Sequence, residues 1–524
     1  LNRKEILLVM FIKFILALLP ILWLMLALSG LKMPGYKACP ISLAITLVLA
    51  LLLWKMPLVD ALTGTLEGAA MGIWPICLVI IAAIFTYNLT VHTKNMDLIK
   101  RMLTSVSRDK RILILIIAWG FGGFMEGMAG FGTAVAIPAS ILCGLGISPI
   151  FAATVCLVAN ATPTAFGSIG IPTITAASVS GLDPRGVAVA VVMQLAVLVV
   201  LTPFLMMIMT GGSVKGLKGI GMITLLSGLG FIIPEYLTAK FVGAELPAVI
   251  GSVCSMVITI LAAKLLKKKE DPEYILKDLD DSEHSGSKPL GLKKAVLAWL
   301  PFLLILLFLL ITSSLVPAVH DPLASVKSSV QIYTGAGAVP YTFTWLATPG
   351  VLIFLAALIG GKAQGASWKE IGMVLKDTLI QMSKTVLTIV SVLATAKVMG
   401  YSGMISDIAA LIVAVTGSFY PLVAPLIGSI GTFVTGSATS SSVLFTGLQV
   451  QTAHTLGMND VWLAAANTVG STAGKIISPQ SIAIAVAATG TVGKESSILN
   501  GSMKYFILFI VLYGVIAFLG LRFI

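Results

Sequence analysis

Charge is scarce in this sequence. Only 11% of its 524 residues are charged, against about 25% in ordinary globular proteins. In contrast, 57% are hydrophobic, and the mean hydropathy is +1.03. A soluble protein with so few charges could not cover its surface with polar groups. The composition therefore excludes an ordinary soluble domain and indicates that lipid surrounds most of the chain.

Histidine and cysteine are scarce as well. The chain has four His and five Cys, and the Cys show neither metal-ligand spacing nor a disulfide pattern. The sequence contains no hydrolytic triad pattern and no phosphate-binding glycine loop with Lys. GFGGF at 120–124 does not match the dinucleotide fingerprint. These absences argue against an enzyme, a metal or cofactor site, and an ATP-driven pump.

Apolar runs of membrane-spanning length are abundant. A helix needs about 20 mostly apolar residues to cross the hydrocarbon core. We therefore predict an all-α polytopic integral membrane protein with roughly 12–14 transmembrane helices. Apolar sequence in 112–180 and 371–490 is interrupted by Gly, Pro, Ser and Thr. The clearest uninterrupted runs are 6–28, 40–54, 71–89, 187–209, 222–233, 247–265, 295–315, 350–359 and 505–521.

The net charge of +12 does not indicate nucleic-acid binding, because the basic residues sit in short loops between apolar runs. Positive residues gather in the cytoplasmic loops of membrane proteins. We therefore predict that 92–111 and 362–376 are cytoplasmic, and that 316–348, which holds one Lys and no Arg, is external. The polar segment 267–294 carries many charges of both signs, which predicts a solvated cytoplasmic linker.

The two sides of this linker resemble each other, which predicts an N-terminal membrane repeat (1–266) and a C-terminal one (295–524). Asn160 and Asn467 each follow an Ala, and after six further residues each is followed by the pattern G-x-I-x-x-P. About thirty residues before each Asn lies a small-residue run, GMAGFGTAV at 127–135 and VTGSATSSSV at 434–443.

Interrupted backbone of this kind has a physical consequence. Its free amide and carbonyl groups are tolerated at membrane depth only where they line a cavity or are buried in protein. We therefore predict a re-entrant hairpin or broken helix in each half, with the two tips meeting near the midplane. There, helix N-termini would face an anion. The alternative is that the small residues only allow close packing of helices.

Four charged residues lie inside apolar sequence, where each charge is costly. Lys475 is a candidate counter-charge for a substrate carboxylate, or else it neutralises an acid such as Glu126. Glu126 is a candidate proton carrier, because apolar surroundings favour the protonated form of a carboxyl. Alternatively, it accepts hydrogen bonds from freed backbone amides. Lys384 and Lys397 share one long segment, with Lys384 expected near an interface.

Polar side chains within the interrupted segments complete the candidate site. They offer the donors and acceptors that a carboxylate and a neighbouring hydroxyl would need. The predicted substrate-binding residues are Asn160, Thr162, Ser437, Thr439, Asn467, Lys475, Ser478 and Gln480, with Glu126 as the proton-coupling residue.

Several of these segments resemble the bacterial lactate permease family, which includes L-lactate and glycolate permeases. The strongest are EGMAGFGTAVAI at 126–137, the stretch 159–172 and GKIISPQSIAIA at 474–485, and the resemblance extends over nearly the whole chain. It implies a multi-pass protein of the bacterial plasma membrane that transports lactate, and possibly glycolate or a related 2-hydroxy acid, by proton symport.

One segment departs from the family pattern. The second small-residue run is often GSDTSSN in the family, whereas here Ala438 replaces the acid and Ser442 replaces the final Asn. This departure leaves open sodium in place of the proton, or another substrate. The alternative within transport is therefore a cation-coupled carrier for another organic anion, such as a dicarboxylate. An alternative from a different class is a membrane-embedded enzyme or a subunit of a respiratory complex.

Overall fold

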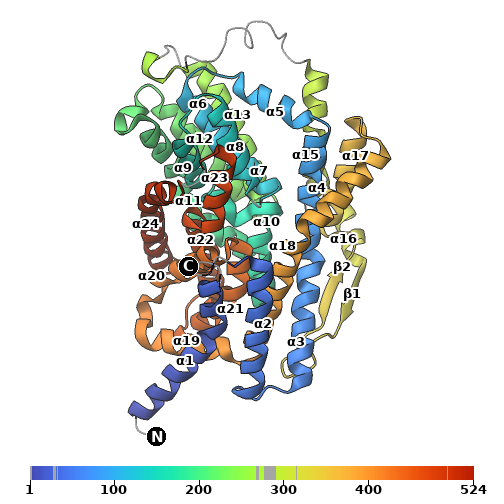
Figure 1. The fold of residues 1–524 in the computed structure, drawn as a ribbon, viewed down its shortest axis with the longest axis vertical. Coiled ribbons are helices and arrows are strands. Elements are labelled where there is room, and N and C mark those ends of the chain that lie inside the picture. The colour runs from blue at the N-terminus through green and yellow to red at the C-terminus, as the bar shows by residue number, and fades with distance from the viewer. Residues whose placement is uncertain are drawn as a thin grey trace.

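The computed structural model describes residues 3–27, 31, 33–130, 132–266, 271–276, 291–313, 315–491 and 494–523. The described chain is an elongated helical bundle with one two-stranded hairpin at its side (Figure 1). This confirms the predicted all-α polytopic class. Most of the predicted linker, 267–270 and 277–290, lies outside the described residues.

The N-terminal half contains long helices and several short ones. Two π-helical segments, Gly72–Cys77 and Leu115–Phe121, join α3 to α4 and α6 to α7. The helices are α1 (Arg3–Met25), α2 (Gly35–Leu52), α3 (Leu58–Met71), α4 (Leu78–His92), α5 (Asn95–Thr104), α6 (Lys110–Ile114), α7 (Gly122–Met128), α8 (Thr133–Gly144), α9 (Pro149–Ala159), α10 (Gly167–Ser180), α11 (Pro184–Gly211), α12 (Gly221–Phe241) and α13 (Pro247–Leu266).

The C-terminal half is helical apart from strands β1 (Lys327–Val330) and β2 (Tyr341–Thr344), which pair antiparallel. Its longest helix, α18, begins with a capping box between Ser367 and Glu370. The helices are α15 (Leu292–Ile311), α16 (Pro317–Ser325), α17 (Pro349–Ala363), α18 (Trp368–Ser402), α19 (Met404–Thr416), α20 (Tyr420–Thr435), α21 (Ala438–Leu456), α22 (Asp460–Ile477), α23 (Pro479–Thr489) and α24 (Glu495–Gly520).

Ten helical stretches of the described chain are long and apolar enough to cross a membrane, or eleven if the bent pair of α9 and Thr162–Ser180 counts as one. This is fewer than the predicted 12–14. A 12-residue helix rises about 18 Å, well short of the hydrocarbon core of about 30 Å. Shorter apolar helical stretches are Met10–Leu24, which is part of the longer helix α1, and Thr133–Gly144, Pro349–Ala363 and Pro479–Thr489.

The first interrupted segment forms a sharp bend. Pro149–Ala159 and Thr162–Ser180 meet at 50°. Residues 168–170 have positive φ angles of 46°, 59° and 75°. The middle one is Ile169, a β-branched residue for which this conformation is strained. The break therefore lies where the sequence predicted an interrupted helix, although the pairing of two such elements as a structural repeat stays a prediction.

The second interrupted segment has a different backbone. Asn467 lies within the continuous helix α22, and the chain breaks only at Ser478, which is extended. Gly470 and Gly474 lie so close to backbone carbonyls of α20 that an added Cβ would collide with them. For these two glycines, the alternative of close helix packing through small residues is confirmed.

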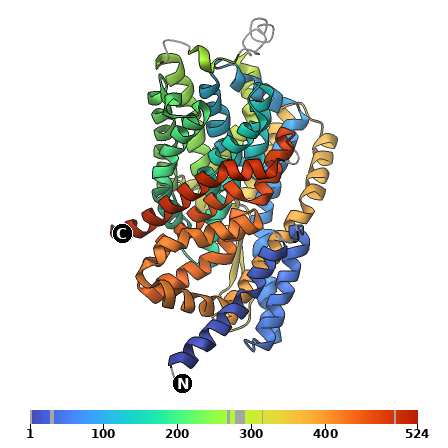
Figure 2. The same ribbon diagram turned by 60° about the vertical axis from the view of Figure 1, so that its left-hand side comes forward.

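The two halves interlock rather than sit side by side. Helix α10 packs against α21, α11 against α22, and α8 and α9 against α23. Figure 2 shows the red C-terminal helix crossing the green helices of the first half at a steep angle. Residues far apart in the sequence thus meet in the centre of the molecule.

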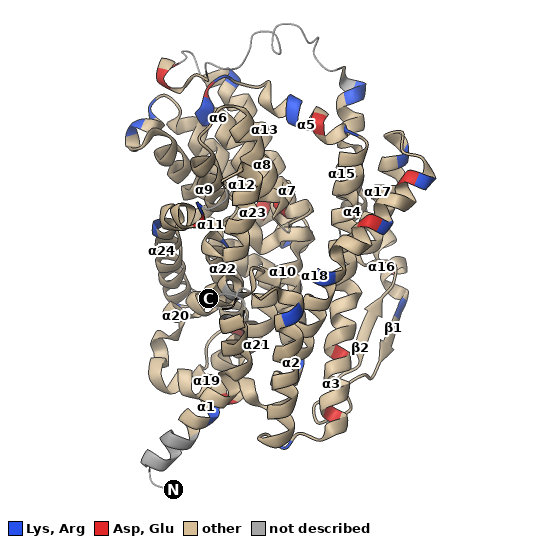
Figure 3. Ribbon diagram, viewed as in Figure 1, with Lys and Arg blue, Asp and Glu red and all other residues tan. Residues whose placement is uncertain are grey.

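Basic residues mark one end of the molecule. Figure 3 shows Lys and Arg near α5, α6 and the start of α15 at the same end. Arg111, 1% exposed, pairs with Asp109 at 2.8 Å, and its guanidinium carbon lies 3.8 Å from the ring centroid of Tyr274. The described start of the polar segment, 271–276, is therefore anchored on the loop before α6.

The hairpin lies within the predicted external loop 316–348. The Tyr341 hydroxyl donates to the Trp74 carbonyl at 2.8 Å, and the Trp74 indole donates to the Thr344 carbonyl at 3.0 Å. These bonds attach the hairpin to the π-helical segment between α3 and α4.

Candidate functional site

A cavity of about 850 Å³ lies between the interlocked halves. The first half supplies its walls from the start of α2 and from α7, α8 and α10, and the second half from α18, α20 to α23, and the start of α24. Cavities of this size with a few converging polar groups are typical ligand sites.

An ion pair lies on the wall of this cavity. The Lys475 ammonium contacts Glu126 Oε1 at 2.8 Å, and their side chains are 11% and 2% exposed. Glu126 Oε2 is buried and has no hydrogen-bond partner among the described residues. Lys475 therefore pairs with Glu126 in this structure, and the role of Lys475 toward a substrate carboxylate stays a prediction. The two opposite charges of this pair lie in direct contact.

Several helices begin at the cavity. Gly35 opens α2, Gly132 precedes α8, Ala438 opens α21 and Pro479 opens α23, and all four line the wall. The first N–H groups of a helix lack partners within the helix and carry a partial positive charge. An anion in the cavity would therefore meet favourable dipoles from more than one direction.

The neighbourhood of Glu126 is tightly packed. An added Cβ on Gly167 would lie 2.6 Å from Glu126 Oε1. The Ser168 hydroxyl donates to the Ala129 carbonyl at 2.8 Å. The strained start of α10 is thereby tied to the end of α7, and this fixes the position of the carboxylate.

The cavity brings together five of the nine predicted site residues. Ser437 also caps α21, accepting from the Ser440 N–H at 3.2 Å. The five residues that line the cavity are Glu126, Ser437, Thr439, Lys475 and Gln480.

The other four predicted residues lie off the cavity wall. Asn160 donates to the Thr164 hydroxyl at 3.4 Å, and Thr162 is buried nearby. Asn467 donates to the Ser441 carbonyl at 3.4 Å between packed helices. The Ser478 hydroxyl caps α23, accepting from the Ser481 N–H at 3.2 Å. Their roles toward a substrate stay predictions.

The cavity wall includes residues that sequence reasoning gave no role. Lys384 and Thr388 on α18 and Tyr36 on α2 line it, and the Lys384 ammonium lies 5.0 Å from the Tyr36 ring centroid. Tyr36 belongs to a segment that resembles the family, GLKMPGYKA at 30–38. A lysine within a long, mostly apolar segment was the available signal for Lys384.

A second buried ion pair joins α3 to α18. The Lys397 ammonium contacts Glu67 Oε1 at 2.9 Å, and the side chains are 19% and 4% exposed. The Tyr401 hydroxyl donates to the same oxygen at 2.6 Å, and the Tyr401 ring stacks on Tyr333 of the hairpin region at 3.6 Å. These residues do not line the cavity.

Many apolar helices around a cavity whose wall carries a buried ion pair define the class as a multi-pass membrane transporter. The family model described as L-lactate permease matches residues 13–524, and the chain belongs to this family. It is therefore a permease of the bacterial plasma membrane, which indicates a transporter rather than an enzyme.

Named relatives match over most of their length. An L-lactate permease of Streptococcus iniae is 49% identical over 451 residues, which cover 86% of this chain and 93% of that protein. The glycolate permease GlcA of Escherichia coli K12 is 35% identical, covering 96% and 94%. An L-lactate permease of Bacillus subtilis 168 is 34% identical, covering 96% and 95%.

Proposed function

We propose that this protein carries L-lactate, and also glycolate, across the plasma membrane together with one proton. The main support for this proposal is the ion pair between Lys475 and Glu126 on the cavity wall. The names of the relatives, L-lactate permease and glycolate permease, supply the substrate class.

Charge balance explains how this pair would couple the two substrates. In the empty site, Lys475 and Glu126 neutralise each other. When Glu126 binds a proton on its free Oε2, Lys475 becomes available to the carboxylate of lactate. The site is then neutral again, because the acid is protonated and the lysine is paired with the anion.

States with only one of the two substrates bound are unfavourable in free energy. A site with only the proton has a charge of +1, and a site with only the anion has a charge of −1. A buried unpaired charge is strongly unfavourable. The carrier would therefore reorient either empty or with both substrates, which is one-to-one symport. Because lactate and proton together carry no net charge, uptake avoids a penalty of about 2.3 kcal/mol per 100 mV of inside-negative potential.

Other cavity residues fit the remaining atoms of a 2-hydroxy acid. Ser437, Thr439 and Gln480 offer both donors and acceptors to the carboxylate and the hydroxyl. Ala438 lacks the carboxyl that the family pattern GSDTSSN would place at this position. Two carboxylates line the cavity, Glu126 and Glu495, and Glu126 is the one that pairs with Lys475.

Uptake of radiolabelled L-lactate into proteoliposomes, with and without an inward proton gradient, tests the proposal. The gradient should stimulate the wild type. Glu126→Gln should still exchange lactate but ignore the gradient, because the amide imitates the protonated acid. Lys475→Ala should lose uptake. Lys376→Gln, an exposed lysine of α18 away from the cavity, is the matched control.

Two results would contradict the proposal. Wild-type protein that ignores lactate refutes the substrate. Lactate uptake that responds to a sodium gradient but not to a proton gradient refutes the coupling ion. Competition by unlabelled glycolate and by a dicarboxylate in the same assay defines the substrate range.

A further inference from the structure

We propose that Lys384, held by Tyr36, is an outer capture point that draws the anionic substrate into the cavity before Lys475 binds it. This inference rests on the proposed function. It concerns a step that the Lys475–Glu126 pair cannot perform, namely attraction of an anion while the inner site is empty.

The inner lysine has no net attraction to offer. In the empty protein, its charge is cancelled by Glu126 at 2.8 Å. The two charges at such short distance act on a remote anion only as a dipole, whose field falls off faster than that of a single charge. A different cation is needed to raise the local concentration of substrate.

Lys384 fits this role by its charge state. It lines the same cavity, and no ion pair joins it to a carboxylate within the described part of the chain. Its ammonium lies 5.0 Å from the centroid of the Tyr36 ring. An aromatic ring attracts a cation without cancelling its charge, so Tyr36 would position the ammonium while leaving the charge available to an anion.

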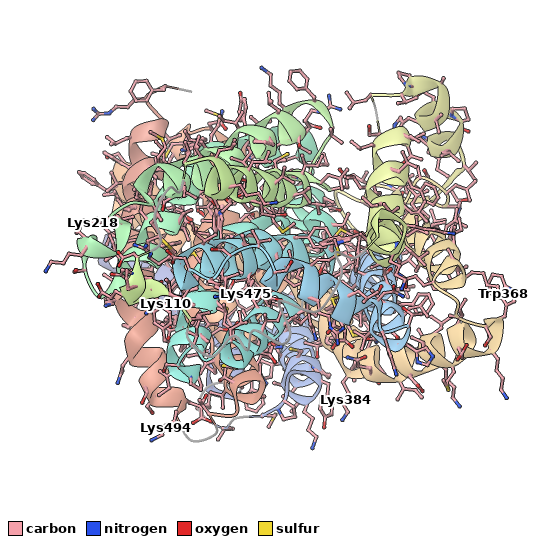
Figure 4. The ribbon with its side chains drawn as sticks, turned by 90° about the horizontal axis from the view of Figure 1, so that it is seen from above. Lys110, Lys218, Trp368, Lys384, Lys475 and Lys494 are labelled. Atoms are coloured by element: carbon pink, nitrogen blue, oxygen red, sulfur yellow. The ribbon has the colours of Figure 1, made fainter. Side chains whose placement is uncertain are left out.

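The position of Lys384 also fits. Along the cavity wall of α18, Lys384 is exposed, Thr388 is half-buried and Ile389 is buried. Glu126 and Lys475 are 2% and 11% exposed, so exposure falls along the wall from Lys384 toward the inner pair. Figure 4 shows Lys475 near the centre of the bundle and Lys384 toward its edge.

The start of α2 packs against α18 next to Lys384. An added Cβ on Gly35 would lie 3.2 Å from Thr388, so the first turn of α2 packs directly on α18. Tyr36 follows in the same turn, which places its ring beside the ammonium. A bulky residue at position 35 would push α2 away from α18 next to Lys384.

Initial rates of radiolabelled L-lactate uptake into proteoliposomes, measured over a range of lactate concentrations and at several ionic strengths, test the inference. Lys384→Gln should raise KM about fivefold, the effect of removing one elementary charge a few ångströms from an anion in water. Vmax should stay unchanged. KM of the wild type should rise with salt because salt screens the capturing charge, and this rise should be smaller in Lys384→Gln.

Companion variants separate capture from folding. Lys384→Arg keeps the charge and should retain the wild-type KM. Tyr36→Phe keeps the aromatic ring and should do the same, whereas Tyr36→Leu should raise KM. Lys376→Gln removes a charge from the same helix away from the cavity and controls for the overall charge of α18.

Two outcomes would overturn the inference. If the wild type transports lactate and Lys384→Gln matches Lys376→Gln in KM and salt dependence, the capture role fails while the proposed function stands. If Lys384→Gln lowers Vmax at unchanged KM, the lysine acts in the transport step rather than in capture. Wild-type protein without lactate uptake would overturn both proposals.

Discussion

Removing one member of the buried pair between Lys397 and Glu67 should be more harmful than removing both. Lys397→Met leaves Glu67, 4% exposed, without its counter-ion, and breaking a buried pair in this way costs about 3 kcal/mol. We expect a clear fall in the melting temperature of the purified protein in detergent. The double variant Glu67→Gln with Lys397→Met should recover much of this loss.

A matched control exists on the same helix. Lys376 is exposed, and Lys376→Met should leave the melting temperature unchanged. Equal melting temperatures for the single Lys397 variant and the double variant would show that the charge pair is not what stabilises the contact between α3 and α18.

A methyl group at position 167 should disturb the inner ion pair. The added Cβ would lie 2.6 Å from Glu126 Oε1, so Gly167→Ala must displace the carboxylate from Lys475. A shift of about 1 Å at a functional group can reduce activity by up to about 100-fold, and we expect the initial rate of lactate uptake to fall at least about tenfold.

The control for this prediction is Gly144→Ala, because a Cβ there meets nothing within 4 Å. Its uptake should equal that of the wild type. Normal uptake by Gly167→Ala, with protein amounts equal in the membrane, would contradict the assigned position of Glu126.

At the residue scale, the predicted charges Glu126 and Lys475 lie on the cavity wall, whereas the predicted amides Asn160 and Asn467 lie off it. Glu126 and Lys475 were recognisable because a charge within apolar sequence is costly and needs a reason. For Asn467 the sequence offers no such criterion. An Asn that bonds to Gln449 and Ser441 between helices has the same sequence context as an Asn that binds a substrate. The place of Lys384 on the wall depends on how α18 packs against α2, which no local pattern encodes.

At the element scale, helices α20 and α22 depend on glycine for their close approach. The Cβ added by Gly470→Ala would collide with the Pro425 carbonyl. Overpacking of this kind costs about 1–3 kcal/mol, so we expect a lower melting temperature in detergent. Lactate uptake should fall as well, because α22 carries Lys475.

Gly447→Ala on the neighbouring helix α21 makes the same change where the nearest atom to the new Cβ is 3.6 Å away. This variant should be neutral, or stabilised by up to about 1 kcal/mol through helix propensity. If both variants melt at the same temperature, close packing of α20 and α22 does not limit stability.

Continuous elements were easier to predict than broken ones. The long apolar run at 187–209 became the single helix α11, which continues through Pro203. The pattern shared by 159–172 and 466–479 produced a bend in one half and a continuous helix in the other. Their backbones differ because Gly470 and Gly474 meet α20, whereas residues 168–170 meet α7 and the loop after α12.

At the scale of the whole molecule, the hydrophobic composition alone fixed the class, since no soluble arrangement suits it. The number of spans could not be fixed in the same way. Helices such as Thr133–Gly144 and Pro479–Thr489 are apolar but too short to cross the hydrocarbon. Whether a short helix spans, or ends at a cavity, depends on its partners in the fold.

The ion pair of Glu126 and Lys475 joins residues 349 positions apart, one on each side of the polar segment 267–294. Neither side alone contains both members of the pair, so we expect the two sides to restore uptake only when they are expressed together. Cells that express residues 1–280 or 281–524 alone should take up no lactate above background, and cells that express both should recover it. Co-expression in which the second fragment carries Lys475→Ala should give no lactate uptake above background. Uptake by one fragment alone would contradict this prediction, because copies of that half would then form a working cavity by themselves.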